Sequence, residues 1–174
     1  IAADKAWIFQ KGNKREGGYR RAVPSPRPIG IINEKVVENL ARQGCIVIAS
    51  GGGGVPVYRD AEGRIRPSEA VIDKDLASAL LGARIGADEF YILTDVPFVY
   101  INYGTPQQEL KEFLDYRDTV KYLEQGMFGK GDMAPKIRAS LQFIKQGGEK
   151  SVSTEAFKLE DRSYGTKITM EYDA

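Results

Sequence analysis

Two short stretches of the chain hold the residue types that stabilise a transferring phosphoryl group. Lys74 stands between Asp73 and Asp75, and Lys136 follows Pro135. A lysine ammonium can hold a phosphoryl group as a point charge, and neighbouring carboxylates keep that ammonium protonated and aimed. The alternative for Lys74 is a solvated cluster of charges at the start of a helix, which is the commoner case.

Lys136 stands at the predicted N-terminus of a helix, because Pro135 suits a first helical turn. The helix dipole disfavours a cation there unless an anion binds as well, which favours a functional role for Lys136. The chain contains no histidine. That absence excludes Ser-His-Asp and Cys-His catalysis and histidine metal sites. Any chemistry must then use Lys, Asp, Arg, Tyr or backbone groups, and phosphoryl transfer fits that list because it depends mainly on positioning and positive charge.

A run of glycines, Gly51–Gly54, follows the apolar segment Cys45–Ala49. The apolar segment predicts a strand buried on both faces of a helix-covered sheet, with Cys45 as a buried hydrophobe. Because glycine lacks Cβ, the run lets backbone N–H groups converge on an anion or a small polar ligand at the end of that strand. A flexible linker is the alternative, but strand-like segments lie close on both sides.

Strand and helix patterns alternate along the remaining chain, which predicts an α/β fold with a mostly parallel sheet. The helices are predicted over 34–43, 71–85, 119–124 and 135–146, and the strands over 55–58, 90–93, 99–101, 151–153 and 166–170.

The N-terminal residues predict a separate hairpin, with strands at 7–9 and 19–23 around a polar, glycine-rich loop. The stiff connector Pro24–Pro28 follows it. We therefore expect a peripheral unit over residues 1–28 and a main domain over residues 29–174.

Composition narrows the class of protein. The 174 residues suit one domain, and 42% hydrophobic residues support a packed core. A net charge of +1 gives no reason to expect a nucleic-acid partner or an anionic membrane surface. No stretch approaches the roughly 18 apolar residues of a membrane span. A lone cysteine makes a reducing cytoplasm the default location.

Four motifs, in this order and spacing, resemble the carbamate kinases of the amino acid kinase family. They are Ser50–Val57, Ala70–Ala77, Ile92–Val96 and Met133–Lys136. Tyr19–Pro26 also resembles the peripheral subdomain of these enzymes. The resemblance spans nearly the whole chain and is looser after about residue 153.

The resemblance implies a three-layer α/β/α sandwich that works as a cytoplasmic homodimer, with the peripheral hairpin attached to the nucleotide-binding C-terminal portion of the kinase domain. It implies reversible phosphoryl transfer between carbamoyl phosphate and ADP, giving ATP and carbamate. Mg²⁺ would be bound mainly through the nucleotide phosphates, with no metal ligand among the protein side chains. Such enzymes suggest ATP production in arginine or other carbamoyl catabolism.

By position, Lys74 and Lys136 resemble the family's catalytic lysines, and Asp75 resembles the aspartate that orients them. The four glycines would face carbamoyl phosphate. The nucleotide pocket would be lined by Asp73, Thr94, Asp95, Val96, Tyr103 and Met133.

The chain departs from the family pattern in two respects. Asp132 and Ala134 stand where the family usually has serine and glycine before the lysine, so Asp132 would weaken nucleotide binding or bind metal. The family's N-terminal portion, with a Gly-Gly-Asn loop and a further lysine that hold carbamoyl phosphate, has no counterpart here. We therefore expect the chain alone to bind nucleotide at best and to leave part of its sheet unpaired.

Two other functions stay open from the sequence. One is another amino acid kinase that phosphorylates a carboxylate or a nucleoside monophosphate, against which the four-glycine run and Tyr19–Pro26 argue. The other is a non-catalytic nucleotide-binding module, which the missing portion and Asp132 favour.

Overall fold

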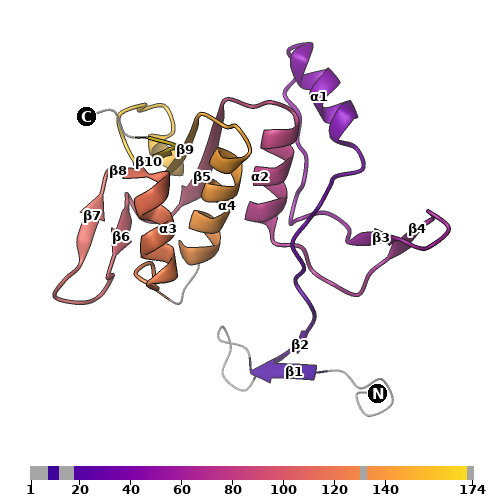
Figure 1. Ribbon diagram of the computed structural model, residues 1–174, viewed down its shortest axis with the longest axis horizontal. Helices are drawn as coiled ribbons and strands as arrows, with labels where there is room; N and C mark the ends of the chain where they lie inside the picture. Colours follow the sequence, from indigo (N-terminus) through magenta and orange to yellow (C-terminus); the bar gives the residue numbers. More distant parts are fainter. Residues whose placement is uncertain (1–7, 12–17, 130–132, 172–174) are drawn as a thin grey trace.

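A four-stranded sheet forms the centre of the computed structural model, which describes residues 8–11, 18–129 and 133–171. Its strand order is β5 (Glu89–Thr94), β9 (Lys150–Glu155), β10 (Thr166–Thr169) and β8 (Phe113–Asp115) (Figure 1). β5 pairs parallel with β9, and β10 pairs parallel with β8. The central pair, β9 with β10, is antiparallel, so the sheet is mixed with a parallel majority.

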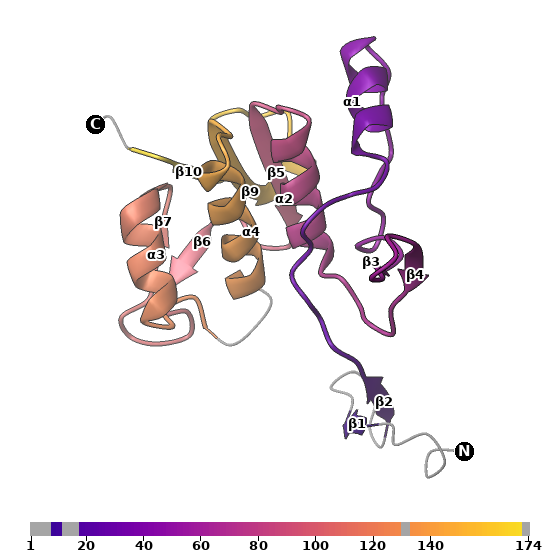
Figure 2. The same cartoon turned by 45° about the vertical axis from the view of Figure 1, so that its right-hand side comes forward.

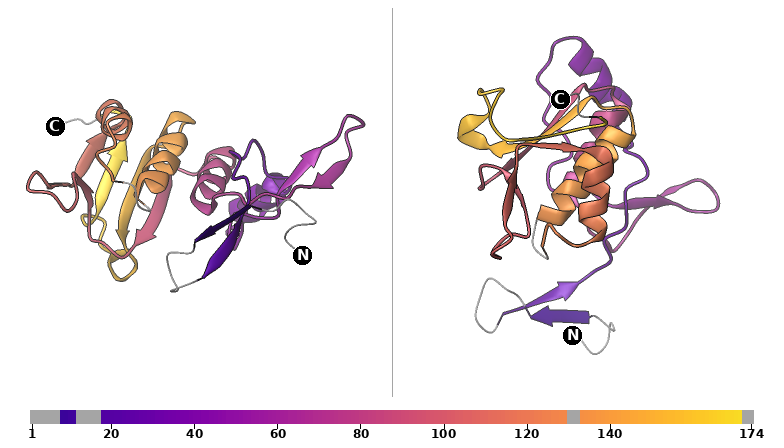
Figure 3. Two further views of the ribbon diagram at one scale, coloured as in Figure 1. Left: turned by 90° about the horizontal axis from the view of Figure 1, so that it is seen from below. Right: turned by 60° about the vertical axis from the view of Figure 1, so that its left-hand side comes forward.

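Three helices pack on one face of this sheet, with α4 (Met133–Lys145) between α2 (Lys74–Arg84) and α3 (Tyr116–Glu124) (Figures 1 and 3). The core between the layers includes Ile92 and Phe143, which are almost completely buried. Alternate residues of a strand point to opposite faces, so Phe90 and Ile92 share the helix-facing side of β5. The ring of Phe90 accordingly lies 5.4 Å from that of Phe143 on α4.

The predicted α/β class is confirmed by this arrangement. Helix α1 (Glu34–Arg42) stands apart from the sheet (Figures 1 and 2). The second helical layer of a three-layer sandwich is therefore not supplied by α1–α4, and it stays a prediction. The opposite face of the sheet meets the connection between β9 and β10, which contains the 3-10 helix η2 (Ala156–Lys158). Arg162 of that connection donates to Glu89 and Tyr91 of β5.

The prediction of a buried strand over Cys45–Ala49 is wrong for this chain. The segment forms no regular strand, and Ile46 and Ile48 are 98% and 97% exposed. Cys45 is exposed as well, against the expectation of a buried thiol. A strand needs a neighbour to pair its backbone groups. Within the part of the chain that the structure describes, no strand pairs with these residues.

Short hairpins complete the fold. The predicted N-terminal hairpin forms from β1 (Ile8–Lys11) and β2 (Tyr19–Ala22), while Trp7 lies outside the described residues. Two further antiparallel hairpins are β3 (Val57–Arg59) with β4 (Ile65–Pro67), and β6 (Val99–Ile101) with β7 (Glu109–Lys111). The sequence did not predict β4, β7 or β8. The division at residue 28 stays a prediction.

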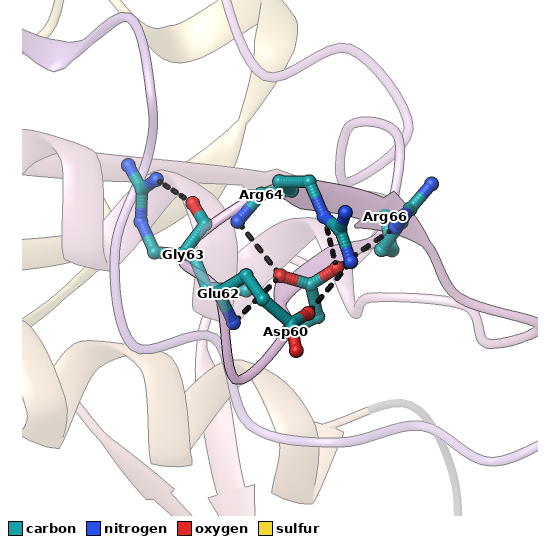
Figure 4. A network of polar contacts seen from close by, with 6 residues as sticks. Asp60, Glu62, Gly63, Arg64 and Arg66 are labelled. Carbon is teal, nitrogen blue, oxygen red and sulfur yellow. Dashed lines mark hydrogen bonds and ion pairs between the residues drawn. The ribbon is translucent and has the colours of Figure 1, made fainter.

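Asp60 closes the turn between β3 and β4 (Figure 4). One carboxylate oxygen accepts the backbone N–H groups of Glu62 and Arg64, and the other accepts from the side chains of Arg64 and Arg66. These bonds fix the turn that the sequence predicted around residues 60–63. None of the described helices has the length and apolar character needed to cross a membrane.

Candidate functional site

Asp75 joins the two lysines that the sequence singled out. Its Oδ1 lies 2.8 Å from Lys74 Nζ, and its Oδ2 lies 3.3 Å from Lys136 Nζ. The side chains of Asp75 and Lys136 are 14% and 15% exposed, whereas that of Lys74 is 56% exposed. The carboxylate thus holds one largely buried lysine and one lysine that reaches solvent, so a single anion contacts both cations.

The start of α2 is fixed by Asp73, whose carboxylate caps the helix. It accepts the backbone N–H groups of Asp75 at 2.9 Å and Leu76 at 3.0 Å. Such a cap satisfies N–H groups that lack a partner within the helix, and it suits the positive end of the helix dipole. Lys74 and Asp75 are therefore held in the first turn of α2.

Close packing of α2 against α4 brings Lys136 to Asp75. Gly82 of α2 faces the Phe143 ring of α4, and a Cβ at Gly82 would lie 3.3 Å from that ring. A larger residue there would push the helices apart. Lys136 lies in the first turn of α4, one turn after Met133. The N-terminal turns of both helices therefore lie next to each other, with Lys136 at Asp75.

The glycine run lies beside the segment that leads into α2. Gly53 has a φ of +115°, and a Cβ on it would stand 2.1 Å from the carbonyl oxygen of Ile72. Only glycine permits that approach and that backbone conformation. Added Cβ atoms on Gly51 and Gly52 would meet nothing within 4 Å, so this part of the run faces open space next to Asp73.

Thr94, Asp95 and Val96 lie at the same edge of the sheet as this group. Helix α2 precedes β5 and α4 precedes β9, and β5 and β9 are parallel. The N-termini of both helices therefore meet the carboxyl ends of both strands, where ligands bind in α/β sheets. Thr94 Oγ1 donates weakly to Asp95 Oδ1, at 3.4 Å.

Tyr103 and Met133 are placed less directly. Tyr103 lies between β6 and β7, is 66% exposed, and has its ring 5.8 Å from that of Tyr100, which the sequence analysis missed. Met133 packs partly against the core. No recorded contact of the described residues joins Tyr103 to the lysines. Ala134 packs against the core as well, and Asp132 lies outside the described residues.

Comparison with known proteins places the chain in a family. Residues 3–152 match the model of the amino acid kinase family. The chain belongs to the amino acid kinase family. The matched range includes Lys74, Asp75, Lys136 and the glycine run.

Several similar curated proteins and solved structures are named carbamate kinases. The chain is 46% identical over 153 residues to a carbamate kinase of Thermoplasma volcanium and 41% identical over 172 residues to one of Halobacterium salinarum. These alignments cover 88% and 96% of this chain but 49% and 56% of the relatives. The chain therefore spans about half the length of the curated relatives it matches.

The chain also covers only about half of similar solved structures. A carbamate kinase from Giardia lamblia bound to AMP-PNP superposes with a TM-score of 0.85 at 35% identity, covering 97% of this chain and 53% of that one. A protein from Aeropyrum pernix superposes with a TM-score of 0.86 at 36% identity. The amino acid kinase fold is thus shared across nearly the whole of this chain.

Proposed function

We propose that this amino acid kinase chain is the nucleotide-binding and phosphoryl-transfer portion of a carbamate kinase. The observation that carries the proposal is the bridge from Asp75 to both Lys74 and Lys136, beside the glycine run. The similarity to named carbamate kinases, at 41–48% identity, supports this substrate class over others in the family.

The reaction transfers one phosphoryl group. A β-phosphate oxygen of ADP attacks the phosphorus of carbamoyl phosphate, the bond from phosphorus to the carbamoyl oxygen breaks, and carbamate leaves with the bonding electron pair. Negative charge spreads over the transferring oxygens, and fixed positive charges stabilise that state. Lys74 and Lys136 supply these charges. Asp75 holds both ammonium groups in place.

The remaining proposed contacts divide between the two substrates. The backbone N–H groups of Gly51–Gly54 face the carbamoyl phosphate side. The nucleotide pocket is lined by Asp73, Thr94, Asp95, Val96, Tyr103 and Met133. Asp73 acts there through the helix start that it caps, because its carboxylate already accepts two backbone N–H groups.

Mg²⁺ would reach the site on the nucleotide phosphates and neutralise their charge. Asp75 is occupied by two lysines and Asp73 by its cap. The described residues include no cluster of three or more carboxylate, thiol or imidazole groups able to hold a metal ion. This donor set fits an ion held mainly by phosphate oxygens.

The whole protein would also need the residues that hold carbamoyl phosphate from the opposite side of the site. The exposed segment Cys45–Ala49 supports this view, because its apolar side chains suit a strand that pairs with a portion outside this chain. We propose that the whole protein is a cytoplasmic homodimer that produces ATP in arginine or other carbamoyl catabolism, and that this chain alone binds ADP without turnover.

Two measurements test the proposal. Calorimetry with Mg·ADP on the 174-residue chain should show binding, and no ATP should form when carbamoyl phosphate is added. When the N-terminal half of the Thermoplasma volcanium carbamate kinase precedes the chain, ATP should form. No ATP from that folded protein would refute the assignment.

The two alternatives give other results. A kinase for carboxylates would use an acyl phosphate, such as acetyl phosphate, better than carbamoyl phosphate as donor to ADP. A non-catalytic module would bind ADP and give no ATP with any donor, even when the N-terminal half of the Thermoplasma volcanium enzyme precedes it.

A further inference from the structure

A second cavity, of about 340 Å³, lies among α2, α3, α4 and the connector that precedes α1. Three cations line it: Arg27 from the connector, and Arg138 and Lys145 from α4. None of its lining residues carries a carboxylate. Cations that gather around a hollow without a counter-charge attract anions.

The lining face of α4 points away from the sheet. Ser140 bonds to Ser151 of β9 through their hydroxyl oxygens, 2.8 Å apart, so Ser140 marks the sheet-facing side. Residues two positions away lie about 200° round a helix. Arg138 and Gln142 therefore share the opposite face, together with Lys145.

The three cations are exposed, and a buried glutamine on this face ties the connector to α4. Gln142 is only 4% exposed, and its Oε1 accepts a hydrogen bond from Arg27 Nε at 3.1 Å. That bond fixes the connector onto α4 and uses one of the five N–H donors of the guanidinium. No ion pair is recorded for Arg138 or Lys145 within the described residues, and both residues line the cavity.

The other walls are apolar or aromatic. Leu76 of α2 and Leu123 and Tyr116 of α3 contribute them. A bare inorganic anion would gain nothing from these surfaces, whereas a ligand with an apolar body would bury area against them. A cavity of this size is at the lower end of small-molecule sites, which begin at about 300 Å³.

We propose that this cavity binds a small organic anion. Arg27, Arg138 and Lys145 hold its carboxylate or phosphate head, and its apolar body packs on Leu76, Leu123 and Tyr116. The cavity is separate from the phosphoryl-transfer group, because none of Lys74, Asp75 and Lys136 lines it. Lys136 and Arg138 lie two positions apart on α4, about 200° round the helix. The proposal goes beyond the proposed function and does not depend on it.

Phenyl phosphate is a suitable probe, titrated into the ¹⁵N-labelled 174-residue chain and followed by NMR. We expect it to shift the side-chain amide signal of Gln142 and the backbone signals of Leu123 and Leu141. Inorganic phosphate and phenol, each carrying one half of the probe, should bind at least about tenfold more weakly.

Variants locate the binding. Charge reversal at Arg138→Glu or Lys145→Glu should weaken binding at Gln142 by about tenfold or more, since each removes one charge-assisted contact. Lys121→Glu, an exposed residue of α3 outside the cavity, controls for net charge. Lys136→Ala should leave the Gln142 shifts intact, which separates this site from phosphate binding at the lysine pair.

Three results would overturn the proposal. They are no shift at Gln142 at millimolar probe, equal loss of binding in Lys121→Glu and Arg138→Glu, and inorganic phosphate binding as tightly as phenyl phosphate.

Discussion

Asp75 and Lys136 are 61 residues apart in the sequence, and their side-chain O and N atoms lie 3.3 Å apart between the first turns of two helices. The ion pair requires α2 and α4 to keep their relative position along the whole contact, including the close approach of Gly82 to Phe143. The distance between the two ammonium groups therefore depends on the packing of α2 against α4 as well as on local sequence.

Replacing Lys74 by alanine tests the proposed charge stabilisation. In the chain preceded by the Thermoplasma volcanium N-terminal half, Lys74→Ala should lower kcat for ATP formation by about 10²-fold or more, because one preorganised charge is removed from the transition state. Lys121→Ala on α3 removes a distant exposed ammonium and should leave kcat unchanged. A loss of less than threefold for Lys74→Ala, with an unchanged unfolding curve, would contradict this role.

Gly53→Ala tests whether the backbone needs glycine beside α2. A Cβ there meets the Ile72 carbonyl oxygen at 2.1 Å, and φ is +115°. We expect the free energy of unfolding to fall by about 1–3 kcal/mol, and the ADP affinity to fall as the start of α2 shifts.

Gly52→Ala is the matched control, since a Cβ there meets nothing within 4 Å and no positive φ is involved. Urea unfolding of both variants gives the comparison. Equal stability of Gly53→Ala and Gly52→Ala would show that the backbone relaxes without cost.

Sequence reasoning located the elements whose signals are local. Asp73 at the start of α2 and the helical spacing of Ile137, Leu141 and Ile144 in α4 predicted both helices that carry the lysines. The structure brings the two lysines to one carboxylate, and their catalytic role stays a prediction.

Properties that depend on distant partners were not predictable. Cys45–Ala49 has the apolar run of a core strand, but burial also needs a neighbouring strand, and the run itself does not show whether one is present. The strands β7 and β8 are only three residues long, and their position follows from pairing with β6 and β10. The contact of Arg27 with Gln142 likewise joins segments that no local pattern relates.

Thr166 links the strand β10 to the hairpin that carries Tyr103. Its hydroxyl accepts from the backbone N–H of Val99 at 2.7 Å and donates to the carbonyl of Lys111, and the residue is fully buried. Thr166→Val removes both bonds, so the backbone N–H of Val99 and the carbonyl of Lys111 lose this partner inside the core. We expect a loss of about 2–4 kcal/mol of unfolding free energy. Thr166→Ser keeps the hydroxyl and should lose less than half as much in the same urea titration.

Glu89 makes the stability of the fold depend on pH in the acid range. Hydrogen bonds from Lys150 and then Tyr91 lower the pKa of its carboxyl from 4.5 to about 2. The lowered pKa means that the ionised carboxylate is favoured in the folded state. Its contribution to stability is fully present above pH 4.5 and is lost as the pH falls from there to about 2.

Glu89→Gln should therefore reduce the free energy of unfolding at pH 7 by about 1–2 kcal/mol, less than the full pKa shift implies, because the side chain is partly exposed. The difference from the parent chain should shrink steadily below pH 4.5 and be small near pH 2. Glu149→Gln, an exposed neighbour outside the cluster, should show no such dependence. Urea unfolding at a series of pH values measures both variants. A difference for Glu89→Gln that stayed constant down to pH 2 would mean that the interaction does not depend on the ionised carboxylate.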